Sequence, residues 1–113
     1  MAKLRHRDDM MSVSELSHYL AAGNTPIVEV LSLDGIYVVR LHHSHGMAQL
    51  VDEHGDVMRF TGTGRVSDLL GPMGIKHGIL TWADQLGDEM IGIPSQSISP
   101  EEALAHGTRI AFR

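Results

Sequence analysis

The dipeptide Asp34-Gly35 constrains the fold of this chain more than any other feature of its sequence. It lies between the apolar-rich runs 27–33 and 36–42. Asp-Gly between two such runs is typical of a two-residue type I′ turn, in which both central residues have a positive φ. The turn predicts a β-hairpin in which these residues face each other: Val28 and Leu41, Glu29 and Arg40, and Val30 and Val39. The pairing of Glu29 with Arg40 joins opposite charges, which favours this register.

Two further connections extend the hairpin into a meander. The loop Glu53-His54-Gly55 is typical of a type I turn with a glycine bulge, and it predicts Leu50 opposite Met58 and Ala48 opposite Phe60. A four-residue connection at 43–46 keeps apolar side chains on one face, because it sets Leu41 opposite Ala48 and Val39 opposite Leu50. We therefore predict four antiparallel strands at 27–33, 36–42, 47–52 and 56–61.

Short helices and further strands complete the predicted fold. Ser12-Val13-Ser14-Glu15 is a capping box that opens a helix at 12–22, and Gly23 can end it. We also predict a helix at 64–70, strands at 79–82 and 90–93, a helix at 100–106 and a strand at 108–112. The predicted fold class is α+β: a four-stranded antiparallel meander with two to three short helices packed on it and further C-terminal strands. Residues 1–10 are expected to form a mobile leader before a single domain at 11–113.

The two faces of the meander differ in composition. One face is apolar and is expected to be covered by helices; it carries Val28, Val30, Tyr37, Val39, Leu41, Ala48, Leu50, Met58 and Phe60. The other face carries a polar row made of Glu29, Arg40, Gln49 and Arg59. Beside this row lies an apolar patch made of Leu31, Leu33, Ile36, Val38, Val51 and Val57.

Composition excludes several classes of function. A length of 113 residues suits one domain, and a net charge of −5 with 4% aromatic residues argues against a nucleic-acid partner. The chain has no cysteine and no apolar run long enough to span a membrane, and its first residues lack the apolar stretch that would predict a secretory signal. We expect a cytoplasmic protein that needs no cofactor.

The eight histidines are the one unusual feature of the composition. His42, His43 and His45 crowd one hairpin and are candidate metal ligands, since neutral imidazole is a common ligand. No acidic residue follows His43-x-His45 at the spacing of a cupin-like site, because Asp52 and Glu53 come too late. Histidines exposed to solvent in a turn are therefore the preferred interpretation.

Three segments, in order after a short N-terminal helix, resemble a known family. They are EVLSLDGIYVVR, LVDEHGDVMRF and ILTWADQLGDEMIGI, and they are similar to short proteins of unknown function from pseudomonads and related proteobacteria. The resemblance covers most of residues 11–93. The family pattern has His before the acid pair and Cys after the Met, where this chain has Gly87 and Ile91 around Asp88-Glu89-Met90. The resemblance implies a shared fold and no activity.

The apolar patch on the second face gives the leading hypothesis for function. A single domain rarely leaves such a patch exposed to water, so we predict a non-enzymatic domain that forms a homodimer or binds a protein partner. Alternatively, the C-terminal segment, with helix 100–106, Ile110 and Phe112, could cover the patch within one chain. The rival hypothesis is a metal-binding protein, or a small metal-dependent enzyme, that uses the histidine-rich hairpin.

Overall fold

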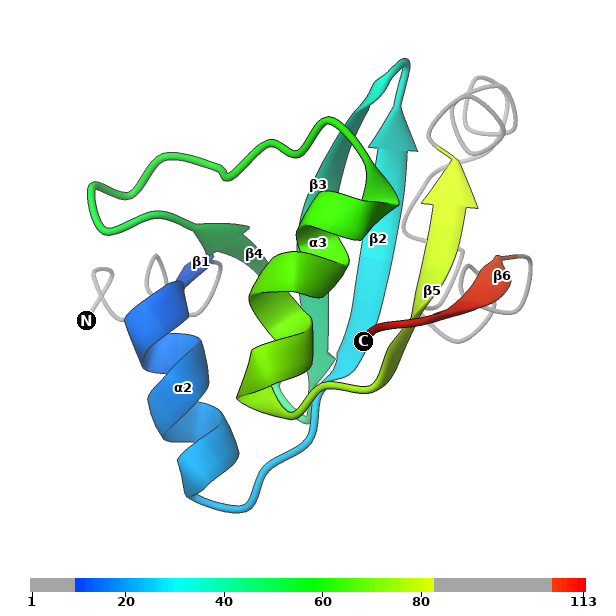
Figure 1. The fold of residues 1–113 in the computed structure, drawn as a ribbon. Helices are drawn as coiled ribbons and strands as arrows, with labels where there is room; N and C mark the ends of the chain where they lie inside the picture. The colour runs from blue at the N-terminus through cyan, green and yellow to red at the C-terminus, as the bar shows by residue number, and fades with distance from the viewer. Residues whose placement is uncertain (1–9, 83–106) are drawn as a thin grey trace.

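The computed structural model of the chain describes residues 10–82 and 107–113, which form an α+β fold. Six strands make one mixed sheet in the order β1-β4-β3-β2-β5-β6, and the helices lie against it (Figure 1). The α+β class is confirmed, but the sheet is larger than the predicted meander and is not purely antiparallel. Among the predicted elements, strand 90–93 and helix 100–106 lie outside the described residues.

The centre of the sheet has the predicted register. β2 (Ile27–Leu33) and β3 (Ile36–His43) pair antiparallel with Glu29 opposite Arg40. Asp34 and Gly35 have φ values of 54° and 94°, as a type I′ turn requires. β4 (Gly46–Val51) continues the meander with Ala48 opposite Leu41. The connection between β3 and β4 is shorter than expected, because His43 pairs with Gly46 and leaves only two residues in the turn.

The predicted fourth strand at 56–61 is wrong. This segment begins in the predicted register, with a bridge from Val57 to Val51, but then leaves β4 and forms a second isolated bridge from Phe60 to Tyr37. The position beside β4 is taken instead by β1 (Met10–Ser12), which pairs with β4 in parallel. Met10, placed by the sequence in the leader, is thus the first residue of this edge strand.

Two strands extend the other side of the sheet. β5 (His77–Trp82) pairs in parallel with β2, and β6 (Thr108–Ala111) pairs antiparallel with β5. β2 is therefore an inner strand with a neighbour on each side. Its burial runs without a break through Val28, Glu29, Val30 and Leu31, and both of its backbone edges are paired.

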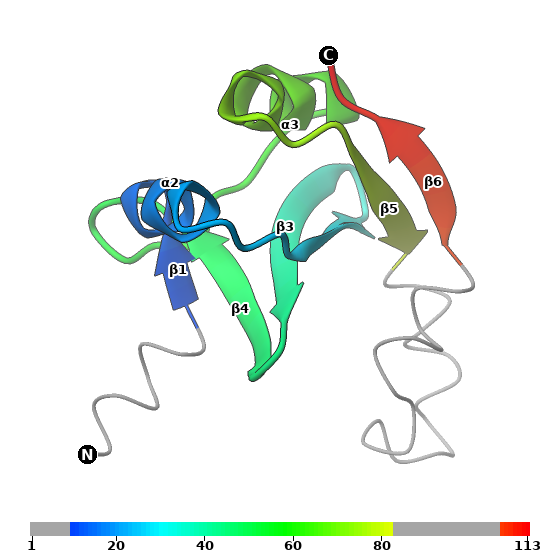
Figure 2. The same ribbon diagram turned by 90° about the horizontal axis from the view of Figure 1, so that it is seen from below.

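The helices cover one face of the sheet. α2 (Val13–Ala21) and α3 (Thr63–Leu70) lie on the same side (Figure 2), and the short 3₁₀ helix η1 (Gly71–Met73) follows α3. The predicted capping box is confirmed: the Glu15 amide donates to Ser12 Oγ over 3.1 Å, and the Ser12 amide donates to Glu15 Oε1 over 2.8 Å. Gly23 has a φ of 95°, as expected after the helix end.

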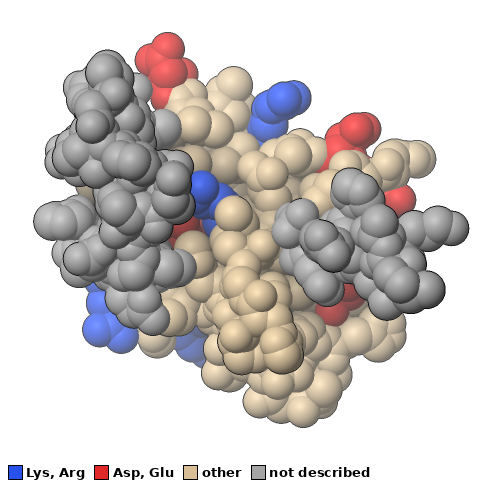
Figure 3. All heavy atoms as spheres, turned by 180° about the vertical axis from the view of Figure 1, so that it is seen from behind, with Lys and Arg blue, Asp and Glu red and all other residues tan. Residues whose placement is uncertain are grey.

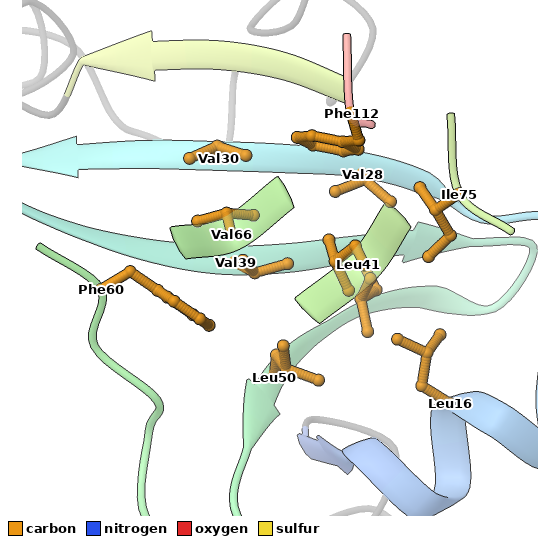
Figure 4. Packing of buried hydrophobic residues seen from close by; sticks show 11 residues of the cluster. Leu16, Val28, Val30, Val39, Leu41, Leu50, Phe60, Val66, Ile75 and Phe112 are labelled. Carbon is orange, nitrogen blue, oxygen red and sulfur yellow. The ribbon is translucent and has the colours of Figure 1, made fainter. Parts of the chain in front are cut away.

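The hydrophobic core lies between these helices and the sheet. Leu16 of α2 and Val66 and Leu70 of α3 are completely buried against the apolar strand side chains (Figure 4). The face predicted to be helix-covered is therefore confirmed. Its buried members include Val28, Val30, Val39, Leu41, Ala48, Leu50 and Phe60.

The C-terminal residues complete this core. Ile110 lies opposite Gly78 in the β5–β6 ladder and packs against the core cluster, and Phe112 is a buried member of it. The Phe112 amide donates to the carbonyl of Lys76 over 2.7 Å. The expectation that Ile110 and Phe112 could cover the second face is thus wrong, because strand parity directs them to the helix side.

Candidate functional site

The face of the sheet opposite the helices, the second face, carries the polar and apolar side chains singled out by the sequence. Ladder partners share a face, so Met10, Gln49, Arg40, Glu29, Ile79 and Arg109 form one row across all six strands. Viewed from this side, the surface formed by the described residues is mostly uncharged, with its charged side chains mainly toward the margins (Figure 3).

A buried carboxylate lies at the middle of this face. Glu29 of β2 is completely buried. Arg40 of β3 donates to both of its oxygens, from Nε to Oε1 over 3.0 Å and from a terminal nitrogen to Oε2 over 2.9 Å. His42 Nε2 lies 2.8 Å from Oε1, and the Thr81 hydroxyl of β5 donates to Oε2. Two strands, β3 and β5, therefore contribute hydrogen bonds to one carboxylate on the strand between them.

These contacts fix the charge of Glu29. Burial by itself raises the pKa of a carboxyl group, but hydrogen bonds from His42, Arg40 and Thr81, with the positive charge of Arg40, outweigh burial and lower the pKa of Glu29 to about 2. The side chain is ionised at neutral pH and cannot donate a proton there. Its chemistry is that of a fixed anion that orients its partners.

The arrangement also fixes the tautomer of His42. An ionised carboxylate only accepts hydrogen bonds, so Nε2 of His42 carries the hydrogen that it donates to Glu29. The other ring nitrogen, Nδ1, is buried and has no hydrogen-bond partner among the described residues. A carboxylate–imidazole pair of this kind can orient a base, but the buried Nδ1 gives it no open path to a substrate.

Exposed apolar side chains surround the buried centre of the second face. The described part of the chain has five exposed large apolar residues, with exposed fractions from 36% to 51%: Met10, Ile27, Leu33, Ile36 and Met47. The ladder pairs place every one of them on the second face. Ile27 and Met47 flank His42 at one end of the strands, and Leu33 and Ile36 flank the hairpin turn at the other. We call these five residues the apolar rim.

The six residues of the predicted interface patch are divided by the structure. Leu31, Val38 and Val51 are buried, with exposed fractions of 8%, 2% and 4%. Leu33 and Ile36 belong to the exposed apolar rim, and Val57 is half-buried where it bridges to Val51. The patch is therefore a buried centre with an exposed end rather than one continuous exposed surface.

The three candidate metal ligands of the histidine-rich hairpin are not brought together. His42 lies on the second face with Glu29, whereas the next strand residue, His43, projects to the helix side, where its ring lies 6.2 Å from that of Tyr19. The ring of His45, in the turn, lies 6.3 Å from that of His43. Within residues 10–82 and 107–113, no group of three or more His, Asp or Glu side chains could hold a metal ion.

Sequence reasoning missed several members of the site. The sequence predicts a strand that contains Thr81 but does not place it beside Glu29, and it suggests His42 as a metal ligand rather than as a carboxylate partner. The signal for His42 was available, because Arg40 and His42 have the same parity on one strand and therefore share a face. Ile27 and Met47 could have been added to the patch by the same parity.

No known protein family, curated protein or solved structure is significantly similar to this chain. The resemblance to a pseudomonad family of unknown function therefore stays a prediction. The segment on which it is sharpest, Asp88-Glu89-Met90, lies outside the described residues. In the described residues, no helix is both long and apolar enough to cross a lipid bilayer.

Proposed function

We propose that this protein is a non-enzymatic, cytoplasmic domain that associates with a second copy of itself through the second face. One observation carries the proposal: all five exposed large apolar residues in the described part of the chain lie on that face. Apolar side chains gathered on one side of a domain are typical of an interaction surface, whereas single ones scattered over the surface need no explanation.

The charges of the second face favour a second copy as the partner. The chain carries a net charge of −5, yet on β2, β3 and β4 the only charged ladder residues of this face are Glu29 and Arg40, apart from His42, which pairs with Glu29. Glu29 and Arg40 neutralise each other. Two copies can therefore approach through these three strands without opposing like charges, and a two-fold dimer is the commonest form of self-association.

Single substitutions in the apolar rim test this proposal. Met47→Glu and Ile36→Glu place a charge at opposite ends of the face, on side chains already 36% and 40% exposed. Each variant should therefore stay folded. Light scattering coupled to size exclusion should show a dimer for the wild type and a shift to monomer for at least one variant, which also identifies the end that makes the contact.

The matched control is Ser17→Glu, which adds the same charge at an exposed position on α2, on the other side of the sheet. It should leave the dimer intact. A wild type that remains monomeric over a wide range of concentrations would refute the proposal. Val38 is less suitable as a test position because it is 2% exposed, so that a charge there would disturb the fold itself.

A further inference from the structure

A pocket of about 440 Å³ lies at the start of β2 and β5, within the range of about 300–1,000 Å³ that small-molecule sites occupy. Its lining includes Thr25, Pro26, Ile27, His77, Ile79 and Arg109. The strand side chains in this set all belong to the second face, because Arg109 pairs with Ile79 and His77 is two residues before Ile79. The pocket therefore lies beside Ile27, at one end of the apolar rim.

Among the described residues, Arg109 is the one Lys, Arg, Asp or Glu residue that lines this pocket. Arg109 and His77 are both exposed and line the pocket, and no acidic side chain is among the lining residues. Arg109 makes no ion pair and no side-chain hydrogen bond with the described part of the chain, in a protein whose net charge is −5. The planar guanidinium of arginine matches a carboxylate with two parallel hydrogen bonds. An unpaired arginine beside a cavity is thus a ready partner for an anion.

Most of the remaining lining residues are apolar. Ile27 is 51% exposed, the largest value among the exposed apolar residues, and Pro26 and the half-buried Ile79 lie beside it in the pocket. Thr25, which carries a neutral hydroxyl group, also lines the pocket. We propose that this pocket binds a small molecule with an aliphatic chain and one carboxylate group. Arg109 and His77 hold the carboxylate, and the chain covers Ile27 and Ile79.

Octanoate is a suitable probe because it has both an aliphatic chain and a carboxylate. Two related compounds, 1-octanol and acetate, each have only one of these features. Titration calorimetry on the full chain should show one octanoate bound per chain. The uncharged 1-octanol should bind at least about ten-fold more weakly, because it lacks the charge-assisted hydrogen bonds. Acetate, which has the carboxylate without the chain, should show no saturable binding at the same concentrations.

Variants assign the binding to this pocket. Arg109→Ala should weaken octanoate binding by about ten-fold or more. The matched control Arg65→Ala removes the same charge from an exposed position on α3 and should leave binding unchanged. Amide NMR spectra of both variants should match the wild type away from the substituted residue, which shows that the fold is retained.

Three results would overturn the proposal: no saturable binding of octanoate, equal binding of octanoate and 1-octanol, or equal losses in the Arg109 and Arg65 variants. Equal losses would mean that the overall charge controls binding rather than a site. The variants that test self-association leave this pocket unchanged, because neither Met47 nor Ile36 lines it. A monomeric wild type that binds octanoate through Arg109 would refute the proposed dimer and support the pocket.

Discussion

Glu29 and Arg40 lie opposite each other across the β2–β3 ladder and share two hydrogen bonds of 3.0 and 2.9 Å. Their surroundings are unequal, because the Glu29 side chain is 1% exposed and the Arg40 side chain is 25% exposed. The acid therefore depends on its protein partners for all of its stabilisation, whereas the guanidinium keeps some contact with water. Removing Arg40 consequently leaves a buried charge, while removing Glu29 leaves a partly hydrated one.

Arg40→Met should lower the free energy of unfolding by about 3 kcal/mol or more, because breaking a buried ion pair on one side leaves its partner uncompensated. Urea denaturation at neutral pH measures this change. In the double variant Glu29→Gln/Arg40→Met, the loss should be much smaller, since no buried charge remains. Equal losses in the single and double variants would show that Arg40 contributes through packing and not through its charge.

The stability of the fold should fall steeply in acid because of Glu29. Its pKa is lowered from 4.5 to about 2 on folding, so that its contribution is fully present above pH 4.5 and is lost as the pH falls toward 2. A shift of this size corresponds to about 3 kcal/mol.

Glu29→Gln isolates this contribution. The pKa of Asp52 is also lowered, chiefly by a hydrogen bond from the Asp56 backbone amide, but this effect is the same in both proteins. Denaturation between pH 7 and pH 2 measures the unfolding free energy of both proteins. As the pH falls, the unfolding free energy of the wild type should decrease relative to that of the variant. A difference that does not change with pH would contradict the assignment.

Gly35→Val should destabilise the protein by more than about 1 kcal/mol, because a β-branched residue is strongly disfavoured at the φ of 94° found there. Gly35→Asn is the matched comparison, since asparagine tolerates the left-handed region far better. The two denaturation midpoints should therefore differ clearly. Identical midpoints would mean that the turn relaxes to another type without cost.

Phe112→Ala should cost about 3–5 kcal/mol, the usual range for removing a buried aromatic side chain. Gly78 explains how the ring is accommodated, since a Cβ there would lie 3.0 Å from Phe112 Cζ and 2.9 Å from the carbonyl oxygen of Val28. Ala111→Ser, at the exposed neighbouring position, should change stability by less than about 0.5 kcal/mol. Thermal or urea unfolding of the two variants compares them directly.

Local turn chemistry made the centre of the sheet predictable from the sequence. Asp34-Gly35 determined the register of β2 and β3, and the capping box determined the start of α2. The parallel pairings were not predictable in the same way, because no turn specifies which strands β1 and β5 will join. Residues 56–61 show how far a turn can predict pairing. The glycine loop correctly predicts the first bridge, Val51 to Val57, but it does not predict that β1 pairs with β4.

Only part of the candidate site could be predicted, because a turn specifies the pairing of some of its strands and not of others. Glu29 and Arg40 follow from the hairpin register, whereas Thr81 reaches Glu29 only through the parallel β2–β5 pair. Burial of Leu31, Val38 and Val51 also could not be inferred from strand parity, because parity assigns a side chain to a face and says nothing of what covers that face.

The partners of Glu29 come from very different distances along the chain, and this difference orders the steps of folding. Arg40 and His42 are 11 and 13 residues away, within one hairpin, whereas Thr81 is 52 residues away. Short loops close at a lower entropic cost than long ones. We infer that Arg40 reaches Glu29 while both are still hydrated, so that water is removed from a neutral pair and not from a lone anion. Thr81→Val should then speed unfolding and leave the folding rate almost unchanged. Because the hairpin pairs Glu29 with Arg40 early, folding avoids the higher barrier that burying an unpaired carboxylate would impose.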